Sequence, residues 1–235
     1  MLIDNMDLKD KVVVITGAST GLGKQLAEHF KKESSKVVIS SRSEDKLKSI
    51  ASDLGVDYCV ADVTSERDVL DLADFTVNKF GQIDVWINNA GIWVPHVPVD
   101  ELDMDRVHQM VEVNLFGTIH GSKAALIQMK ALKSGTIINI LSTSALEGRA
   151  GSSGYCASKY AVVGFSKSLR LEAKEFGISV LNIYLGGMQT NFFDEKRPDN
   201  YEEYMKPEMV ADKIIKNLKS KKPEEELIIK RPASS

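Results

Sequence analysis

The chain alternates short apolar runs with longer segments in which apolar residues recur every three or four positions. The short runs are rich in β-branched residues and have the length of buried strands. They cover residues 12–16, 36–41, 57–61, 83–88, 136–142, 179–184 and 227–229. The longer segments have the helical period and include residues 22–32, 105–132 and 153–176. Ser43, just after the second run, is placed to cap a further helix.

Continuous apolar strands that alternate with amphipathic helices are typical of a parallel sheet covered on both faces. The order of the segments therefore predicts an α/β fold of the doubly wound type, with about seven parallel strands and helices on both faces. In such sheets ligands bind beyond the carboxyl ends of the strands, where the strand order reverses. We therefore expect the functional residues in the segments that follow the strands.

The composition limits the classes of partner. The 235 residues fit a single domain, 1–235, with 43% apolar and 27% charged residues. The formal net charge of -3 provides no basic surface for a phosphate backbone, so nucleic acid is not an expected partner. Cys59 and Cys156 have no neighbours at metal-ligand or redox spacing, which predicts reduced thiols, no metal and a cytoplasmic location. The N-terminus lacks a signal-peptide pattern and no apolar run approaches a membrane span, so no membrane association is expected.

Glycines cluster where the first strand runs into the first helix. Their spacing is Gly-x-x-x-Gly-x-Gly, in the segment Thr16-Gly17-Ala18-Ser19-Thr20-Gly21-Leu22-Gly23. Glycine allows a tight turn and lets backbone N–H groups approach a pyrophosphate, while the following helix directs its positive end at that charge. The position between a strand and a helix favours a dinucleotide site over the alternative of an ordinary glycine-rich turn.

Further motifs follow in order along the chain. They are Asp62-Val63 after the third strand, Asn88-Asn89-Ala90-Gly91 at the end of the fourth, Asn114 in a long helix, Ser142 at the end of the fifth strand, and Tyr155 and Lys159 as Tyr-x-x-x-Lys. With the glycine spacing, they resemble the motifs of the classical short-chain dehydrogenase/reductases over essentially the whole chain. The resemblance implies a Rossmann-type NAD(P)-binding domain. Its implied cofactor site comprises Gly17, Ser19, Thr20, Gly21, Leu22, Gly23, Ser41, Arg42, Asp62, Val63, Asn89, Ala90, Gly91, Tyr155, Lys159, Gly186, Met188 and Thr190.

Tyr155 and Lys159 lie four residues apart on a predicted helix and therefore share one face. A phenol with a pKa of about 10 is a poor acid or base near neutrality, and a nearby ammonium lowers that pKa. The pair predicts a tyrosine that protonates a carbonyl oxygen, or deprotonates an alcohol in reverse. Ser142 would hold that oxygen, with Ser144 as a competitor for the role. By the resemblance, Lys159 also binds the nicotinamide ribose and Asn114 holds a water in a proton relay; the alternative for Asn114 is a purely structural role.

The end of the second predicted strand favours NADP over NAD. NAD enzymes carry an acidic residue there, which binds the adenosine 2′-hydroxyl. Here the position is Ser41, followed by Arg42, whose guanidinium can bind a 2′-phosphate through two parallel hydrogen bonds. By the resemblance, arginine at this step is typical of members that use NADP. The alternative is that Arg42 is a solvated loop charge, and Thr20 stands where some NADP enzymes have a second basic residue.

After the sixth predicted strand the chain departs from the family. Leu185 replaces the usual proline before Gly186. Proline fixes φ and lacks an N–H, so we expect a looser turn and an additional backbone N–H that needs a partner.

The substrate side carries weaker signals. Residues 191–206 are predicted to cover the cleft as a short lid. Their position relative to the motifs makes seven residues substrate candidates: Trp93, Val94, Ser144, Glu147, Gly187, Phe192 and Phe193. The aromatic members could equally belong to the core or to an interface, and His96 is interpreted as an exposed loop histidine rather than a ligand.

Together these patterns predict an NADPH-dependent reductase of an aldehyde or ketone, able to run in both directions. One alternative is a 3-oxoacyl-carrier-protein reductase, which would need a basic docking patch to which Lys133 could contribute but Phe176 could not. Another is a non-catalytic NADP(H)-binding sensor or scaffold, for which the intact Ser142, Tyr155 and Lys159 would be unnecessary. Family members pair their two long helices across a two-fold axis, so the resemblance implies a homodimer or homotetramer.

Overall fold

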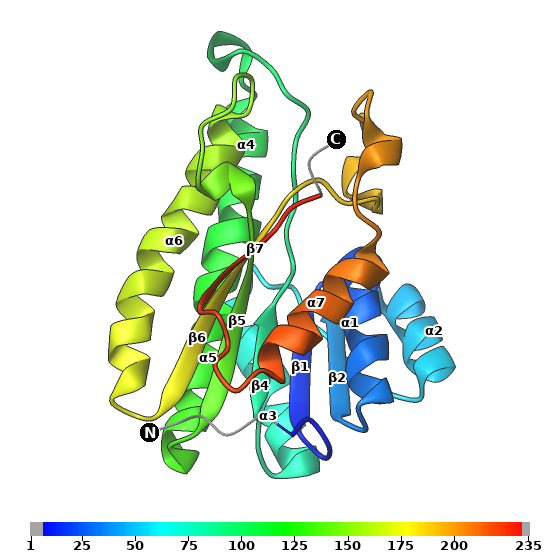
Figure 1. The fold of residues 1–235 in the computed structure, drawn as a ribbon, viewed down its shortest axis with the longest axis vertical. Coiled ribbons are helices and arrows are strands. Elements are labelled where there is room, and N and C mark those ends of the chain that lie inside the picture. The colour runs from blue at the N-terminus through cyan, green and yellow to red at the C-terminus, as the bar shows by residue number, and fades with distance from the viewer. Residues whose placement is uncertain (1–6, 232–235) are drawn as a thin grey trace.

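The computed structural model describes residues 7–231, which form one parallel seven-stranded sheet in the order β3-β2-β1-β4-β5-β6-β7 (Figure 1). The strands are β1 (Val12–Thr16), β2 (Lys36–Ser41), β3 (Asp57–Val60), β4 (Val85–Asn88), β5 (Gly135–Ser142), β6 (Ile178–Leu185) and β7 (Glu226–Ile229). The predicted fold class is confirmed. Every predicted strand is present, with the largest shift at β4, which begins at Val85 rather than at residue 83.

Helices cover both faces of the sheet (Figure 1). They are α1 (Gly21–Lys32), α2 (Glu44–Leu54), α3 (Glu66–Phe80), α4 (Met104–Val111), α5 (Gly117–Leu132), α6 (Ser153–Lys174) and α7 (Pro207–Leu218). One core forms beneath α1, α2 and α7, and the other beneath α3, α5 and α6. The predicted helix 105–132 is interrupted by a π-helical turn, Glu112–Phe116, between α4 and α5. Within residues 7–231, no helix has the length and apolar character needed to span a bilayer.

The two cores explain the continuous apolar runs. Successive residues of a strand point to opposite faces of the sheet. Val13 and Ile15 of β1 enter the core beneath α1, α2 and α7, whereas Val14 enters the opposite core with Trp86 of β4. Because both faces are covered, both sets of alternating positions are mostly apolar, and the buried polar residues such as Asn139 and Asn182 are hydrogen-bonded to one another.

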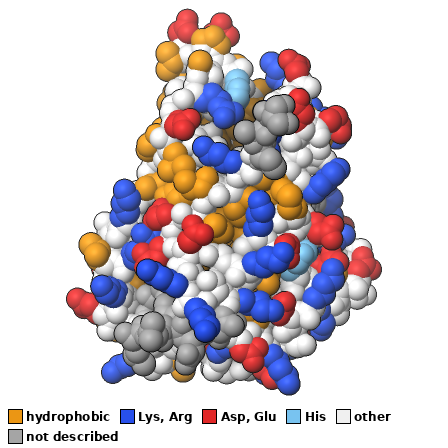
Figure 2. All heavy atoms as spheres, in the orientation of Figure 1, with side chains coloured by type: hydrophobic (Ala, Val, Ile, Leu, Met, Phe, Trp, Pro, Cys, Tyr) orange, Lys and Arg blue, Asp and Glu red, His pale blue; other side chains and the backbone are white. Residues whose placement is uncertain are grey.

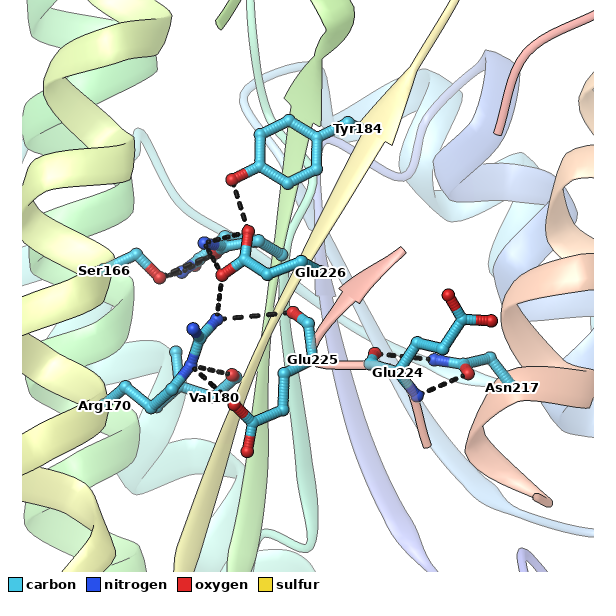
Figure 3. A network of polar contacts seen from close by, with 10 residues as sticks. Ser166, Arg170, Val180, Tyr184, Asn217, Glu224, Glu225 and Glu226 are labelled. Carbon is cyan, nitrogen blue, oxygen red and sulfur yellow. Dashed lines mark hydrogen bonds and ion pairs between the residues drawn. The ribbon is translucent and has the colours of Figure 1, made fainter. Parts of the chain in front are cut away.

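Polar side chains fasten β7, the last strand at its edge of the sheet (Figure 3). Arg170 of α6 places Nη2 2.5 Å from Oε1 of Glu226, and the Tyr184 hydroxyl donates to Oε2 of the same carboxylate at 2.5 Å. On the other side, Asn217 of α7 donates through Nδ2 to the carbonyl of Glu224 and accepts from its N–H. These contacts hold Ile229 beside the carboxyl end of β6, next to the site described below.

Candidate active site

A cleft of about 1060 Å³ opens at the carboxyl ends of the strands, where the order reverses between β1 and β4. The predicted site residues that line it are Gly17, Ser19, Thr20, Gly21, Leu22, Ser41, Arg42, Asp62, Val63, Asn89, Ala90, Gly91, Trp93, Ser142, Ser144, Tyr155, Lys159, Gly186, Gly187, Met188, Thr190, Phe192 and Phe193. Four predicted residues lie outside this lining: Gly23, Val94, Asn114 and Glu147.

Two glycines of the loop lie so close to other backbone atoms that neither position has room for a side chain. Gly17 has φ +63°, and a Cβ there would lie 2.7 Å from Cα of Ala90. A Cβ at Gly23 would lie 2.6 Å from the carbonyl oxygen of Gly17, which explains how Gly23 can matter without lining the cleft. Within the described chain, Thr20 makes no side-chain capping bond to α1 and the first turn of α1 has no acidic residue. The first N–H groups of α1 can therefore bind an anion.

Asn89 ties the end of β4 to the glycine loop. Its Nδ2 donates to the carbonyl oxygens of Thr16 at 2.8 Å and Gly17 at 3.0 Å. In return, Oγ1 of Thr16 accepts from the N–H groups of Asn89 and Ala90. The segment after β4 is thereby fixed beside the loop, and both form one wall of the cleft.

The end of β2 presents a hydroxyl and a guanidinium to the cleft. Oγ of Ser41 is buried and has no hydrogen-bond partner among residues 7–231. Nη1 of Arg42 lies 3.9 Å from Oδ2 of Asp62, and the Arg42 side chain is 62% exposed. An exposed pair at this distance contributes little stability, so the guanidinium remains able to bind another anion.

Asn114 is fully buried in the π-helical turn. Its Oδ1 accepts from the N–H of Ile92 at 2.9 Å, and its Nδ2 donates to the carbonyl of Ile92 at 2.9 Å and to Oγ of Ser158 at 3.1 Å. The side chain therefore joins the segment after β4 to α6. Those bonds use both Nδ2 hydrogens, so a relay water would have to donate to Oδ1 or to the backbone carbonyl, each of which already accepts one of the bonds named here or a bond from Oγ1 of Thr118.

Ser142, Tyr155 and Lys159 converge at the carboxyl end of β5. Ser142 is the last residue of β5, while Tyr155 and Lys159 lie in the first turns of α6, and both are buried. Nζ of Lys159 donates to the carbonyl of Ile140 at 3.3 Å and lies 5.9 Å from the centre of the Tyr155 ring. The Ser142 hydroxyl accepts from the N–H of Ser144 at 3.1 Å and lies close enough to Tyr155 to lower the pKa of its phenol. Ser144 thus supports Ser142 through its backbone and also lines the cleft.

Burial dominates the ionisation of this group. It raises the pKa of Tyr155 to about 12, against the lowering effects of the Ser142 hydrogen bond and the Arg149 charge. Burial also lowers the pKa of Lys159 to about 8. The pKa of Tyr155 is therefore raised overall and not lowered as the spacing suggested, because desolvation of the phenolate outweighs the favourable contacts around it. Tyr155 keeps its proton at neutral pH.

Leu185 continues β6 instead of loosening the turn. It is buried, and it is in register with Ser142 of β5 on one side and Ile229 of β7 on the other. The next N–H, that of Gly186, donates to the carbonyl of Ile229 at 2.9 Å. With Leu185 in place of the usual proline, this turn stays hydrogen-bonded to the sheet, contrary to the looser turn expected from the sequence.

Residues 191–206 form two 3₁₀ turns, Asn191–Phe193 and Tyr201–Glu203, beside the cleft. Two backbone hydrogen bonds join the end of this segment to the residues that precede it. The N–H of Gln189 donates to the carbonyl of Met205, and the N–H of Met205 donates to the carbonyl of Gly187. A Cβ at Gly187 would lie 2.5 Å from the ring of Tyr204. The segment folds back over the end of β6.

Aromatic rings connect the two sides of the substrate end. Ring centres are 5.2 Å apart for Trp93 and Phe193, 5.5 Å for Phe192 and Phe193, and 6.2 Å for Phe192 and Tyr155, all at edge-to-face angles. These three candidates therefore lie together in the cleft. His96 is exposed, as interpreted from the sequence, but it also lines the cleft.

The turn between β5 and α6 directs different residues into the cleft from those that the sequence suggested. Glu147 is exposed and lies outside the lining, whereas Arg149 and Ser152 contribute to it. Lys196 and Tyr204 of the 191–206 segment also contribute. No motif marks these residues; the available signal is their position between Ser142 and Tyr155 or within the predicted lid.

The parallel sheet and its cleft define an α/β protein of the dinucleotide-binding type, and the glycine loop, the uncapped α1 and the unpartnered Ser41 hydroxyl fit such a ligand. Residues 11–201 match the family model described as short chain dehydrogenase. An uncharacterized oxidoreductase of Staphylococcus saprophyticus is 34% identical over 97% of this chain and 98% of its own. One of Staphylococcus aureus is 32% identical over 88% of this chain and 90% of its own. The chain belongs to the short-chain dehydrogenase family and is an oxidoreductase of that type.

Solved structures share this fold. The alcohol dehydrogenase of the archaeon Thermococcus sibiricus, complexed with 5-hydroxy-NADP, has a TM-score of 0.87 at 28% identity, over 96% of this chain and 98% of its own. Levodione reductase has a TM-score of 0.85 at 26% identity, over 94% of this chain and 96% of its own.

Proposed function

We propose that this protein is an NADPH-dependent reductase of aldehydes or ketones, with Tyr155 as the general acid. The observation that carries the proposal is the group of Ser142, Tyr155 and Lys159, which opens into the glycine-lined cleft. A module that only binds a dinucleotide has no need for a buried tyrosine and lysine beside a serine. The two structural neighbours, an alcohol dehydrogenase and a reductase, support the same chemistry.

The chain's own residues bind the carbonyl oxygen and supply its proton. When bound, the nicotinamide cofactor supplies the hydride. The hydroxyls of Ser142 and Tyr155 hold the carbonyl oxygen, and these hydrogen bonds strengthen as negative charge develops on it. Tyr155 then donates its proton to that oxygen. Positive charge on Lys159 stabilises the phenolate that remains, and the same groups can accept a proton from an alcohol in the reverse direction.

Residues along the cleft would hold the cofactor in an extended position. The glycine loop and the first turn of α1 would bind the pyrophosphate, and Ser41 and Arg42 would bind the 2′-phosphate. Lys159 would bind the nicotinamide ribose, with Met188 and Thr190 at the carboxamide. The Thermococcus sibiricus structure, which contains an NADP derivative, supports NADP as the cofactor class.

The proposed activity predicts that a carbonyl compound accelerates NADPH oxidation by the purified protein. A panel of aldehydes, diketones, quinones and 3-oxoesters should include at least one compound that raises the rate well above that of NADPH and protein alone. The decrease in NADPH absorbance is the measurement, with binding followed separately by NADPH fluorescence. Tight NADPH binding without acceleration by any member of the panel would favour a non-catalytic sensor.

We also propose a homodimer formed through α5 and α6. Large apolar side chains are exposed on these helices and on the π-helical turn: Phe116, Ile127, Leu132, Tyr160 and Leu171. Phe116 and Ile127 are about three helical turns apart, as are Tyr160 and Leu171, so each pair lies on one face. Exposed apolar stripes of this kind are typical of protein interfaces.

Sedimentation at micromolar concentration should therefore give twice the 25.9 kDa chain mass. The double substitution Ile127→Glu and Leu171→Glu should shift the protein toward the monomer, because it places two carboxylates in each half of an apolar interface. The matched control is Val99→Glu, which changes an equally exposed apolar residue outside α5 and α6. An unmodified protein that sediments as a monomer would contradict the proposed dimer.

A further inference from the structure

Basic side chains surround the substrate end of the cleft. Arg149 lies in the turn before α6, and Lys196 and Arg197 lie in the 191–206 segment, which comes from a distant part of the sequence. Figure 2 shows basic, acidic and hydrophobic side chains together on the upper part of the molecule. Among residues 7–231, neither Arg149 nor Lys196 has a side-chain hydrogen bond or ion pair, whereas Arg197 lies 3.6 Å from Asp194. Asp199 also lines this end, so the charged side chains of its lining are three basic ones and one acidic one.

Arg149 and Lys196 act on the same neighbour. His96 lines the cleft and contacts Trp93 edge to face, with ring centres 5.5 Å apart. After burial, the charges of Arg149 and Lys196 are the causes that hold the pKa of His96 below its usual value. The loop of His96 is fixed to the Arg149 turn because the N–H of Val97 donates to the carbonyl of Gly151 at 2.9 Å. Arg149 and Lys196 therefore both lie in the neighbourhood of His96 and line the same cleft.

A buried hydroxyl next to these cations has no partner. Ser152 is 4% exposed, lines the cleft, and its Oγ makes no hydrogen bond within the described part of the chain. Buried hydroxyls in native proteins are generally paired, since an unmade bond costs free energy. Because the residue borders the cleft, rotation of its side chain would bring the hydroxyl to a polar ligand group, which would supply the missing partner.

Apolar rings lie between this polar end and Tyr155. Phe192 contacts Tyr155, Phe193 contacts both Phe192 and Trp93, and the ring centres of Phe193 and Tyr204 are 5.5 Å apart. A small polar carbonyl compound would leave this surface exposed to water. The arrangement fits a molecule with an apolar or aromatic body and a negative group at one end.

We propose that the substrate is a carbonyl compound that carries a carboxylate, which Arg149, Lys196 and Ser152 bind while the rings of Trp93, Phe192 and Phe193 cover its apolar body. This inference rests on the proposed reductase function. The planar guanidinium of Arg149 can form two parallel hydrogen bonds with a carboxylate. Lys196 supplies a second charge from the 191–206 segment, so binding of the carboxylate links that segment to the turn before α6.

Matched pairs of substrates test the proposal. Aromatic oxo acids with one to four carbons between the carbonyl and the carboxylate should be compared with their primary amides, which have similar size but no charge. At one of these spacings, kcat/KM for the acid should exceed that for the amide at least about tenfold, which corresponds to about 1.4 kcal/mol. In the Arg149→Gln and Lys196→Gln double variant this ratio should fall to near one. A ratio cancels any general loss of activity, and Lys174→Gln, an exposed lysine at the other end of α6, should leave it unchanged.

Binding of a compound that cannot be reduced separates this inference from the reductase function. Calorimetry should detect 3-phenylpropionate binding that is weaker for 3-phenylpropanamide and is lost in Lys196→Gln, an exposed position that does not affect folding of the core. Such binding with no reduction of any carbonyl compound would support the carboxylate site and contradict the reductase function. Reduction of amides as efficiently as acids, together with equal binding of the two probes, would overturn the carboxylate site and leave the reductase function in place.

Discussion

Replacing Tyr155 by Phe is expected to lower kcat for carbonyl reduction by about 10³-fold, within the range that a positioned general acid contributes. The substitution removes the hydroxyl that donates the proton and retains the ring that packs against Phe192. Because burial raises the pKa of Tyr155 to about 12, the unmodified hydroxyl is protonated at neutral pH. The lost step is therefore proton donation and not a change of charge in the resting site.

The dissociation constant of NADPH distinguishes this role from a structural one. Tyr155→Phe should leave it nearly unchanged in a fluorescence titration, whereas Lys159→Ala should weaken cofactor binding and also lower kcat. Tyr160→Phe is the matched control, since it removes a tyrosine hydroxyl from the same helix at an exposed position. Retention of most of kcat by Tyr155→Phe would show that another group donates the proton.

The fold was predictable because a sheet that is covered on both faces requires apolar residues along the whole of each strand. Residues such as Val13 and Val14 enter opposite cores, so the strands appear as unbroken apolar runs. The π-helical turn at Asn114 was not predictable. It coincides with two hydrogen bonds between Asn114 and Ile92, a tertiary contact that the apolar periodicity of residues 105–132 does not encode.

The candidate site was predictable where chemistry restricts the residue type. Only glycine fits at Gly17, because a Cβ would collide with the backbone of Ala90, and such a requirement produces a spacing that can be recognised. The substrate end has no equivalent restriction. Arg149 reaches the cleft and Glu147 does not, although both lie in the same turn, because the direction of a loop side chain is set by contacts such as that between Val97 and Gly151.

The pKa values of Tyr155 and Lys159 are a second property that the sequence does not predict. Helical spacing correctly places Tyr155 and Lys159 on one face, but the sign of a pKa change depends on how completely both groups are removed from water. Tyr155 and Lys159 are each less than a tenth exposed, so desolvation dominates both values. Burial of this kind follows from the packing of α6 and cannot be read from a four-residue spacing.

The cofactor preference should be reversible by changing the end of β2. We expect NADPH to be preferred over NADH about tenfold in kcat/KM, equivalent to about 1.4 kcal/mol. Arg42 is exposed and only loosely paired with Asp62, so its guanidinium can bind the 2′-phosphate, and the unpartnered hydroxyl of Ser41 can donate to the same group. The carboxylates of Glu44 and Asp45 in the first turn of α2 would repel the 2′-phosphate, so we expect only a moderate preference for NADPH.

Two substitutions test the two sides of this preference. Arg42→Ala should weaken NADPH binding about tenfold and leave NADH binding nearly unchanged, because the two cofactors differ only in the 2′-phosphate. Arg42→Lys should restore part of the loss, since it keeps the charge but not the planar pair of donors. Ser41→Asp should reverse the preference, because its carboxylate would repel the 2′-phosphate and accept hydrogen bonds from the 2′-hydroxyl of NADH. Equal kcat/KM for both cofactors in the unmodified protein at physiological salt would refute the assignment of Arg42 to the phosphate.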